Sequence, residues 1–309
     1  MTDRESAAQA TPNAYQILLA IMDSIDALVY VADMNTHELL FANRYVRDNW
    51  GDVIGTKCWQ SLQNGQTGPC PFCTNDRLLD AAGQPTKPYQ WEFQNTRNAQ
   101  WYDCRDTALR WIDGRIVRLE VATDITERKR MEDELRRLAI SDSLTGLFNR
   151  RHFFELAQLE YERFRRYSHP LALIMADIDH FKAVNDQYGH LIGDQVLQAV
   201  ADTLQRNLRQ VDILGRYGGE EFAMALPETD TATARALAER LRTAIADRVF
   251  ATGQGPLALT LSLGVAAVSD RASIDFEHLL DAADRMLYQA KLAGRNRVMT
   301  WDAETKSTP

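Results

Sequence analysis

The sequence has no long apolar run and no excess of basic residues. Its longest apolar stretches, such as Tyr15 to Met22, fall well short of the about 20 residues that span a bilayer. The segment 1–13 is polar and lacks the apolar core of a signal peptide. With 43 acidic and 35 basic residues, the formal charge is −8, which argues against a nucleic acid or an anionic membrane surface as partner. We therefore expect a cytoplasmic protein that binds neither.

Cysteine is scarce, and all four cysteines lie in the first third of the chain: Cys58, Cys70, Cys73 and Cys104. In a reducing compartment they are thiols, metal ligands or redox groups before they are structural disulfides. Cys70 and Cys73 are spaced to lie on one tight loop, and the other two would complete a four-thiolate zinc or iron–sulfur site. Plain reduced thiols are favoured over this metal site and over a redox pair, since a single Cys-x-x-Cys is common without either.

The 309 residues suffice for two domains, each with its own core. Residues 1–13 are predicted to be a disordered tail, and residues 14–127 a first domain. Helical apolar spacing follows Tyr15, and five β-rich runs follow that helix at 27–33, 38–42, 89–96, 100–110 and 116–123. Two strands, short helices and three more strands indicate an antiparallel sheet with helices on one face. This order and the closing Asp124-Ile125-Thr126 resemble the PAS sensor family, which implies a bound ligand that the sequence does not identify.

The segment 128–141 is strongly charged and predicts a helical linker. Met131, Leu135 and Leu138 are spaced by four and then three residues, which is the narrow stripe of a two-stranded coiled coil. The alternative is a solvated connecting helix that packs on one domain, because two heptads are too few to decide.

Two carboxylates are predicted at the tip of a β-hairpin in the second half of the chain. Apolar runs at 213–217 and 222–226 flank Gly218-Gly219, and glycine takes the positive φ that tight hairpin turns require. Because glycine carries no side chain, a nucleotide has room to lie against the backbone while Glu220 and Glu221 face a cation. The alternative is an acidic surface turn.

A second pair of acids ends a continuously apolar strand. The run 171–176 is followed by Asp177-Ile178-Asp179, and carboxylates at the end of a buried strand are costly unless something compensates them. A divalent cation would do so, with Glu220 and Glu221 as further ligands if the strand lies beside the hairpin.

Residues 142–302 resemble the GGDEF family of diguanylate cyclases, here with Gly218-Gly219-Glu220-Glu221-Phe222. The resemblance implies a palm-like α/β domain with a mostly antiparallel sheet, so that the whole chain is α+β, with a polar tail at 303–309. It also implies a homodimer that condenses two GTP into cyclic di-GMP and releases pyrophosphate. The alternative function is a catalytically inactive domain that acts as a receptor for cyclic di-GMP or GTP.

The resemblance implies roles for individual residues. Asp177, Glu220 and the Ile178 carbonyl would ligate Mg²⁺ or Mn²⁺, with Glu221 at or next to the metal. Glu220 and Glu221 would be catalytic, Glu220 by assisting deprotonation of the attacking ribose hydroxyl. Attack on an α-phosphate requires a deprotonated nucleophile and a screened phosphate, and paired metal ions supply both.

Further positions match the substrate and product sites of the family. Asn185 and Asp194 would contact guanine, although Asp194 also suits a helix cap. The phosphates would be bound by Lys182, Lys291, Arg295 and the main-chain amides of His180 and Phe181. Lys291 is equally explained as a basic residue near a helix C-terminus. Arg209, Asp212 and Arg240 match an inhibitory product site, for which the alternative is a surface ion pair.

Overall fold

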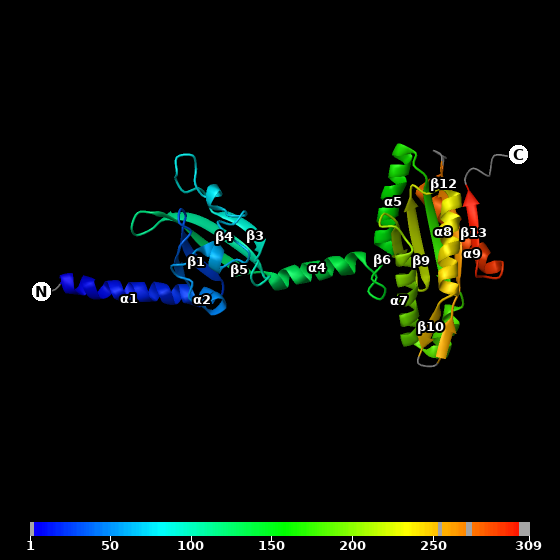
Figure 1. The fold of residues 1–309 in the computed structure, drawn as a ribbon, viewed down its shortest axis with the longest axis horizontal. Helices are drawn as coiled ribbons and strands as arrows, with labels where there is room; N and C mark the ends of the chain where they lie inside the picture. The colour runs from blue at the N-terminus through cyan, green and yellow to red at the C-terminus, as the bar shows by residue number, and fades with distance from the viewer. Residues whose placement is uncertain (1–2, 253–254, 270–273, 303–309) are drawn as a thin grey trace. The chain divides into compact units, whose positions relative to one another are not determined.

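The computed structural model describes residues 3–252, 255–269 and 274–302, and it divides into two compact units, Met1–Glu134 and Leu135–Pro309 (Figure 1). The predicted polar tail at 303–309 lies outside the described residues. No helix in the described ranges combines the length and the apolarity needed to cross a membrane.

The N-terminal unit is built on one antiparallel sheet with the strand order β2-β1-β5-β4-β3. Its strands confirm the predicted order of two strands, short helices and three strands. Their bounds are β1 (Leu28–Asp33), β2 (Leu39–Ala42), β3 (Tyr89–Gln94), β4 (Trp101–Arg110) and β5 (Ile116–Asp124). Between β2 and β3 lie α2 (Arg44–Trp50), α3 (Cys58–Ser61) and the 3₁₀ helix η1 (Asn75–Arg77).

Alternation along β4 gives this sheet one buried face. Tyr102, Cys104, Asp106 and Ala108 are all buried, because every second side chain of a strand points to the same side. Asp106 therefore lies on the buried face, together with Arg118 and Glu120 of β5.

The first helix is longer than the sequence predicted. Helix α1 spans Asp3–Ser24, so it begins inside the segment 1–13 that was expected to be a disordered tail. The physical reason is that Arg, Glu, Ala and Gln, which make up most of 4–10, are good helix formers even without an apolar face.

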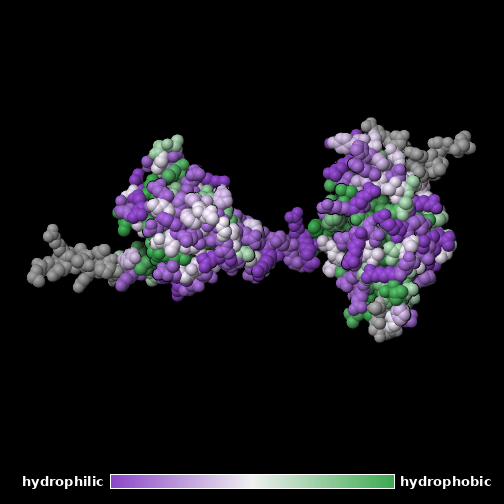
Figure 2. Space-filling model, viewed as in Figure 1, coloured by the Kyte–Doolittle hydropathy of each residue, from purple (hydrophilic) through white to green (hydrophobic). Residues whose placement is uncertain are grey.

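The predicted linker helix is present as α4 (Thr126–Ile140). None of its residues is buried within the described part of the chain, and Met131, Leu135 and Leu138 are each more than half exposed. The face of α4 seen in Figure 2 is almost entirely hydrophilic, in keeping with its many charges.

The C-terminal unit has a six-stranded sheet in the order β13-β12-β7-β9-β8-β6. The three central pairings, β12 with β7, β7 with β9 and β9 with β8, are antiparallel, whereas β13 and β6 pair parallel at the two edges. The prediction of a mostly antiparallel sheet is confirmed. The strands are β6 (Phe148–Asn149), β7 (Leu171–Ile178), β8 (Ile213–Arg216), β9 (Glu221–Pro227), β12 (Leu261–Val268) and β13 (Val298–Asp302). A separate hairpin joins β10 (Val249–Thr252) to β11 (Gly255–Ala258).

Helices cover both faces of this sheet, so β7 is buried along its whole length. Its even-numbered residues, such as Ile174, pack in one core with α6 (Phe181–Tyr188), α7 (His190–Arg206) and α8 (Thr231–Ala246). Its odd-numbered residues, such as Leu173, pack in a second core with α5 (Arg150–Tyr167) and α9 (Phe276–Leu292). A strand that is buried on both faces reads as a continuous apolar run, which is why the sequence identified it.

Helix α9 approaches the sheet closely at one point. A Cβ on Gly264 of β12 would lie 2.1 Å from both the Ala283 carbonyl oxygen and the Leu287 nitrogen. Glycine is therefore required there, and the contact holds α9 against β12 one turn before Lys291.

Candidate active site

The predicted hairpin is formed by β8 and β9, with Arg216 opposite Phe222. The nitrogens of Tyr217 and Gly218 donate hydrogen bonds to the Glu221 carbonyl oxygen at 2.8 and 3.3 Å. The predicted reason for the glycines was wrong, because neither Gly218 nor Gly219 adopts a positive φ. Instead, a Cβ on Gly218 would lie 2.4 Å from Glu221 Oε2, so that glycine lets the Glu221 carboxylate lie against the main chain.

An arginine that the sequence analysis did not select holds the tip of this hairpin. Arg216 Nη2 donates to the Gly219 carbonyl at 2.6 Å, and Nη1 donates to Asp142 Oδ1 at 3.1 Å. Burial acts to raise the pKa of Asp142, but hydrogen bonds from Thr145 and Arg216 outweigh it and lower that pKa. The start of the domain is thus tied to the Gly-Gly turn through one guanidinium group.

Asp177 lies beside the hairpin, as predicted. Strand β7 pairs with β9 so that Asp177 is opposite Glu221, and the Ile178 nitrogen donates to the Glu220 carbonyl at 3.3 Å. Asp177 is only 5% exposed. Strands β7 and β9, which are separate in the sequence, therefore bring three acidic residues together where β7 ends and β9 begins.

Burial and charge act together on these carboxylates. Burial raises the pKa of Asp177, and Lys291 opposes this by a hydrogen bond and by its charge. Burial also raises the pKa of Glu220, and the negative charge of Asp177 raises it further. Lys291 Nζ is 2.7 Å from Asp177 Oδ2, so this lysine compensates one of the acids directly.

Asp179 has a structural role. Its Oδ1 accepts a hydrogen bond from Ser262 Oγ at 2.6 Å, and its Oδ2 accepts from Thr260 Oγ1 at 2.6 Å and from the Asn296 nitrogen at 3.0 Å. Both oxygens are occupied by the protein, so Asp179 secures the loop after α9 instead of facing the hairpin acids.

The donor atoms near Asp177 suit magnesium. Within the described ranges, no three side chains of His, Cys, Asp or Glu form a group that would hold a metal alone. Asp177, Glu220 and the Ile178 carbonyl nevertheless offer hard oxygen donors. Mg²⁺ is commonly held by one or two carboxylates together with substrate phosphates and waters, so this set fits an ion that arrives with a triphosphate.

Asn185 and Asp194 are brought together by α6 and α7. A Cβ on Gly193 would lie 1.9 Å from Asn185 Oδ1, so the amide of Asn185 lies against the residue that precedes Asp194. Helix α7 begins at His190, which places the exposed Asp194 inside the helix. The alternative that Asp194 caps a helix is therefore wrong, because the cap is Gly189.

The predicted phosphate-binding residues lie at the ends of two helices. The main-chain amides of His180 and Phe181 begin α6, with Lys182 exposed in its first turn. His180 has a left-handed φ of 58°, and Arg295, which follows α9, has a φ of 63°. The Arg295 nitrogen donates to the Ala290 carbonyl at 3.0 Å, which fixes the chain as it turns back to the sheet.

The three residues of the predicted product site share one neighbourhood. The Arg209 nitrogen donates to Asp212 Oδ2 at 2.8 Å, and Arg240 Nη2 of α8 donates to the Asn207 carbonyl at 2.8 Å. The turn after α7 therefore holds Arg209 and Asp212 close to Arg240.

The cysteines do not form the four-thiolate site that the sequence suggested. All four are free, and they form no metal-ligating group in the described part of the chain. Burial raises the pKa of Cys58 and of Cys104, and it raises the pKa of Cys70 to about 11. The arrangement of these cysteines in the described part of the chain therefore does not support the zinc or iron–sulfur hypothesis.

Known proteins resemble the C-terminal unit. Residues 139–297 match the family model described as "Diguanylate cyclase, GGDEF domain". The chain is 44% identical over 168 residues to the diguanylate cyclase DgcP of Pseudomonas aeruginosa, a match that covers 54% of this chain and 25% of that protein. It is 41% identical over 188 residues to the diguanylate cyclase DgcM of Escherichia coli, which covers 61% of this chain and 45% of that protein. The chain thus spans less than half the length of these relatives.

Among solved structures, the coiled coil and GGDEF domain of DgcB from Caulobacter crescentus in complex with c-di-GMP is similar, with a TM-score of 0.53 and 32% identity. That match covers 57% of this chain and 93% of the other. The diguanylate cyclase SiaD of Pseudomonas aeruginosa, solved with its activator SiaC, has a TM-score of 0.51 and 35% identity over 57% of this chain and 66% of the other.

Proposed function

The chain belongs to the GGDEF family of diguanylate cyclases, and from this premise we propose that residues 142–302 condense two GTP into cyclic di-GMP and release pyrophosphate. The observation that carries the proposal is the pairing of β7 with β9, which sets Asp177 opposite Glu221 and next to Glu220. The enzyme named in the two curated relatives is a diguanylate cyclase, which supports the same conclusion.

Asp177, Glu220 and the Ile178 carbonyl are the groups that would hold Mg²⁺ or Mn²⁺, with Glu221 beside them. When bound, the ion would screen the phosphate charge and lower the pKa of the attacking ribose hydroxyl. Glu220 is the proton acceptor in this scheme. Lys291 offsets the charge of Asp177 and holds a cation next to the incoming phosphates.

The remaining groups orient the nucleotide. Asp194 would accept hydrogen bonds from the guanine N1 and N2 donors, and the adjacent Asn185 amide would pair with other edge atoms. Lys182, Arg295 and the amides that begin α6 would bind the phosphates. The Arg216 clamp would keep the Gly-Gly turn in place while the backbone lies against the nucleotide.

Two protomers are required in this scheme, because each domain binds a single GTP and the two nucleotides must face each other. The exposed stripe of Met131, Leu135 and Leu138 on α4 supports a parallel coiled-coil dimer. We infer that residues 14–127 form a PAS-like sensor that alters the dimer geometry, and the order of the five antiparallel strands supports this.

Product inhibition is the second level of control in this proposal. Arg209, Asp212 and Arg240 would bind cyclic di-GMP, since arginine grips guanine edges or phosphates and aspartate accepts from guanine donors. Their common neighbourhood supports one site, and the DgcB structure was solved with c-di-GMP.

The direct test is incubation of the full chain with GTP and magnesium, followed by mass spectrometry of the product. Wild type should form cyclic di-GMP, and Glu220→Gln should be slower by at least 100-fold. Glu162→Gln, an exposed acid on α5, is the matched control and should keep the wild-type rate. If wild type binds cyclic di-GMP but never turns over GTP, the chain is a receptor and the enzymatic proposal is wrong.

A further inference from the structure

The N-terminal unit contains a cavity with two different walls. The cavity is small: water-sized groups can occupy about 40 Å³ of it. One side is an aromatic wall made of Trp59, Phe72, Trp91 and Phe93. The other side is polar and contains Tyr30, Arg118 and Glu120.

The aromatic wall is assembled from the sheet and from the loop that follows α3. The ring centroids of Trp91 and Phe93 on β3 are 5.2 Å apart, and Phe72 of the loop lies 4.5 Å from Phe93. All three side chains are only partly buried. Rings that are in contact with each other and still partly exposed at a cavity offer a face for a planar apolar group.

The polar side is a row of residues across three adjacent strands. Glu120 of β5 is directly opposite Tyr30 of β1 and directly opposite Asp106 of β4. Tyr30 Oη donates to Glu120 Oε2 at 2.6 Å, and Trp91 Nε1 donates to Asp106 Oδ2 at 2.9 Å. Burial, and after it the charge of Asp106, raises the pKa of Glu120 to about 8. Glu120 is therefore mostly protonated at neutral pH and repels an anion less than an ionised acid would.

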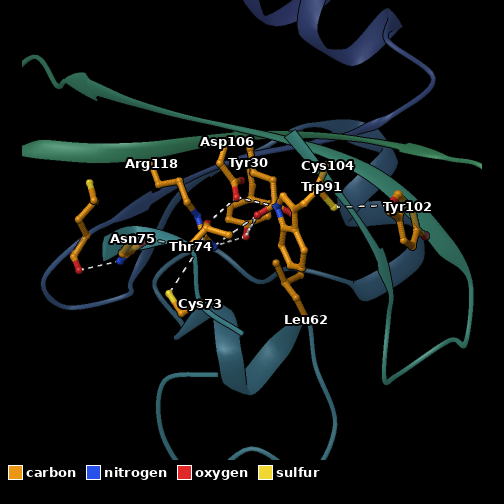
Figure 3. A network of polar contacts seen from close by, with 12 residues as sticks. Tyr30, Leu62, Cys73, Thr74, Asn75, Trp91, Tyr102, Cys104, Asp106 and Arg118 are labelled. Atoms are coloured by element: carbon orange, nitrogen blue, oxygen red, sulfur yellow. Dashed lines mark hydrogen bonds and ion pairs between the residues drawn. The ribbon is translucent and has the colours of Figure 1, made fainter. Parts of the chain in front are cut away.

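Two polar groups here have incomplete hydrogen bonds: Asp106, whose Oδ1 has no partner among the described residues, and Arg118. Arg118 is 6% exposed, and its Nε also lacks a partner in the described part of the chain. Its Nη1 reaches Thr74, Asn75 and Cys73 only at 3.5, 3.4 and 3.8 Å (Figure 3). Its Nη2 lies 3.5 Å from Glu120. Only the bond from Nη2 to Tyr30 Oη is short. N–H···O bonds are usually about 2.7–3.2 Å, so most donors of this guanidinium are underused.

A buried guanidinium with free donor capacity at the edge of a cavity selects an anion. A carboxylate matches its planar fork with two parallel hydrogen bonds and satisfies donors that are otherwise costly to bury. A single negative charge is favoured over the double charge of a phosphate, because Glu120 lines the cavity and Asp106 lies directly opposite Glu120 on β4. The apolar part of the ligand would then lie against the aromatic wall.

We propose that this cavity binds a small organic monocarboxylate with a planar apolar body, whose carboxylate is held by Arg118 and whose body packs on the aromatic wall. The site lies entirely within the N-terminal unit and does not depend on the cyclase activity proposed above. Its ligand would be the input to the sensor, which the sequence did not identify.

The test is calorimetric titration of the full chain at pH 7, without GTP, using benzoate and phenylacetate as probes. At least one of them should bind, and at least tenfold more tightly than benzamide, which has the same shape as benzoate but no charge. Benzylamine, a cation of similar size, should not bind. Equal affinity for benzoate and benzamide, or no heat from either carboxylate at millimolar concentration, overturns the proposal.

Variants assign the binding to its residues. Arg118→Lys keeps the positive charge but loses the two-pronged guanidinium, and it should weaken the binding of the carboxylate by at least tenfold. Arg105→Gln replaces an exposed arginine on β4 and should leave this affinity unchanged. Phe72→Leu lies outside the ion network and should weaken the binding of each carboxylate that wild type binds by about threefold or more. If Arg118→Lys fails to fold, as judged by circular dichroism, the wild-type probe series and Phe72→Leu still decide. Unchanged affinity in Phe72→Leu contradicts the role of the aromatic wall.

Discussion

Lys291 Nζ lies 2.7 Å from Asp177 Oδ2, so the end of α9 supplies the counter-charge for a carboxylate that is almost fully buried on β7. This pair connects the predicted phosphate-binding end of α9 to the acidic end of β7. It also means that Lys291, for which phosphate binding and a plain helix-end position are the two predicted explanations, has a structural partner.

Lys291→Met should lower the stability of the C-terminal unit by about 1 kcal/mol, because Asp177 loses its ionic partner while Lys291 itself is partly exposed. In the Lys291→Met background, Asp177→Asn should cost less than it does in wild type. Urea unfolding of the four proteins of this cycle measures the coupling. Lys182→Met, an exposed lysine on α6, is the control. Strict additivity of the two changes would show that the pair contributes nothing.

Arg216→Gln should reduce kcat by about tenfold or more, because the Gly-Gly turn loses the clamp to Asp142. Asp142→Asn should have a similar effect, and the double variant should be little worse than either single one, since both remove the same contact. Steady-state kinetics on the three variants, with exposed Arg235→Gln as the control, provides the measurement. Multiplicative losses would indicate two independent roles.

Gly193→Ala should displace the Asn185 side chain, because the added Cβ would meet its Oδ1 at 1.9 Å. We expect a KM for GTP raised about tenfold, while the helix itself gains up to about 1 kcal/mol in propensity. A melting temperature at or above that of wild type, together with the higher KM, would separate this effect from unfolding. Gly68→Ala, which would meet nothing within 4 Å, is the control. An unchanged KM would exclude Asn185 from substrate binding.

Arg209→Ala should abolish inhibition by cyclic di-GMP while turnover stays within about twofold of wild type, because its turn is separate from the hairpin acids. Initial rates measured at increasing product concentration test this, and Arg240→Ala should behave alike. Inhibition that persists in both variants would place the product elsewhere.

The stability of the N-terminal unit should fall as the pH rises from about 4.5 to about 8. Glu120 has a raised pKa in the folded state, so between these values the folded state binds more protons than the unfolded state and loses stability with increasing pH. Asp106, Arg118 and Tyr30 face it from the three strands of the row. Glu120→Gln mimics the protonated acid, so the difference in melting temperature between the two proteins should grow by several degrees from pH 6 to 8.5. A constant difference would mean that Glu120 does not titrate in this window.

Local pattern was sufficient for much of the fold. The alternation in β4 and the continuous apolarity of β7 each follow from how many faces a strand buries. The number of buried faces can be predicted from the pattern of consecutive residues in one strand. The hairpin acids and the acids after β7 could be selected for the same reason, since charged groups next to buried strands stand out. Helix α1 reaches into 1–13, where helix propensity acts without an apolar stripe.

The sequence alone determined which residue types were available to bind a metal, a guanine and a triphosphate, and roughly which strands and helices carry them. Only the tertiary structure decided their partners: Lys291 on Asp177, Arg216 on Asp142, and Asp179 turned toward Ser262. It also left Arg118 with unused donors beside a cavity. The physical reason is that periodicity reports burial on one element, whereas a hydrogen bond between distant segments depends on strand order and register, which no single segment encodes.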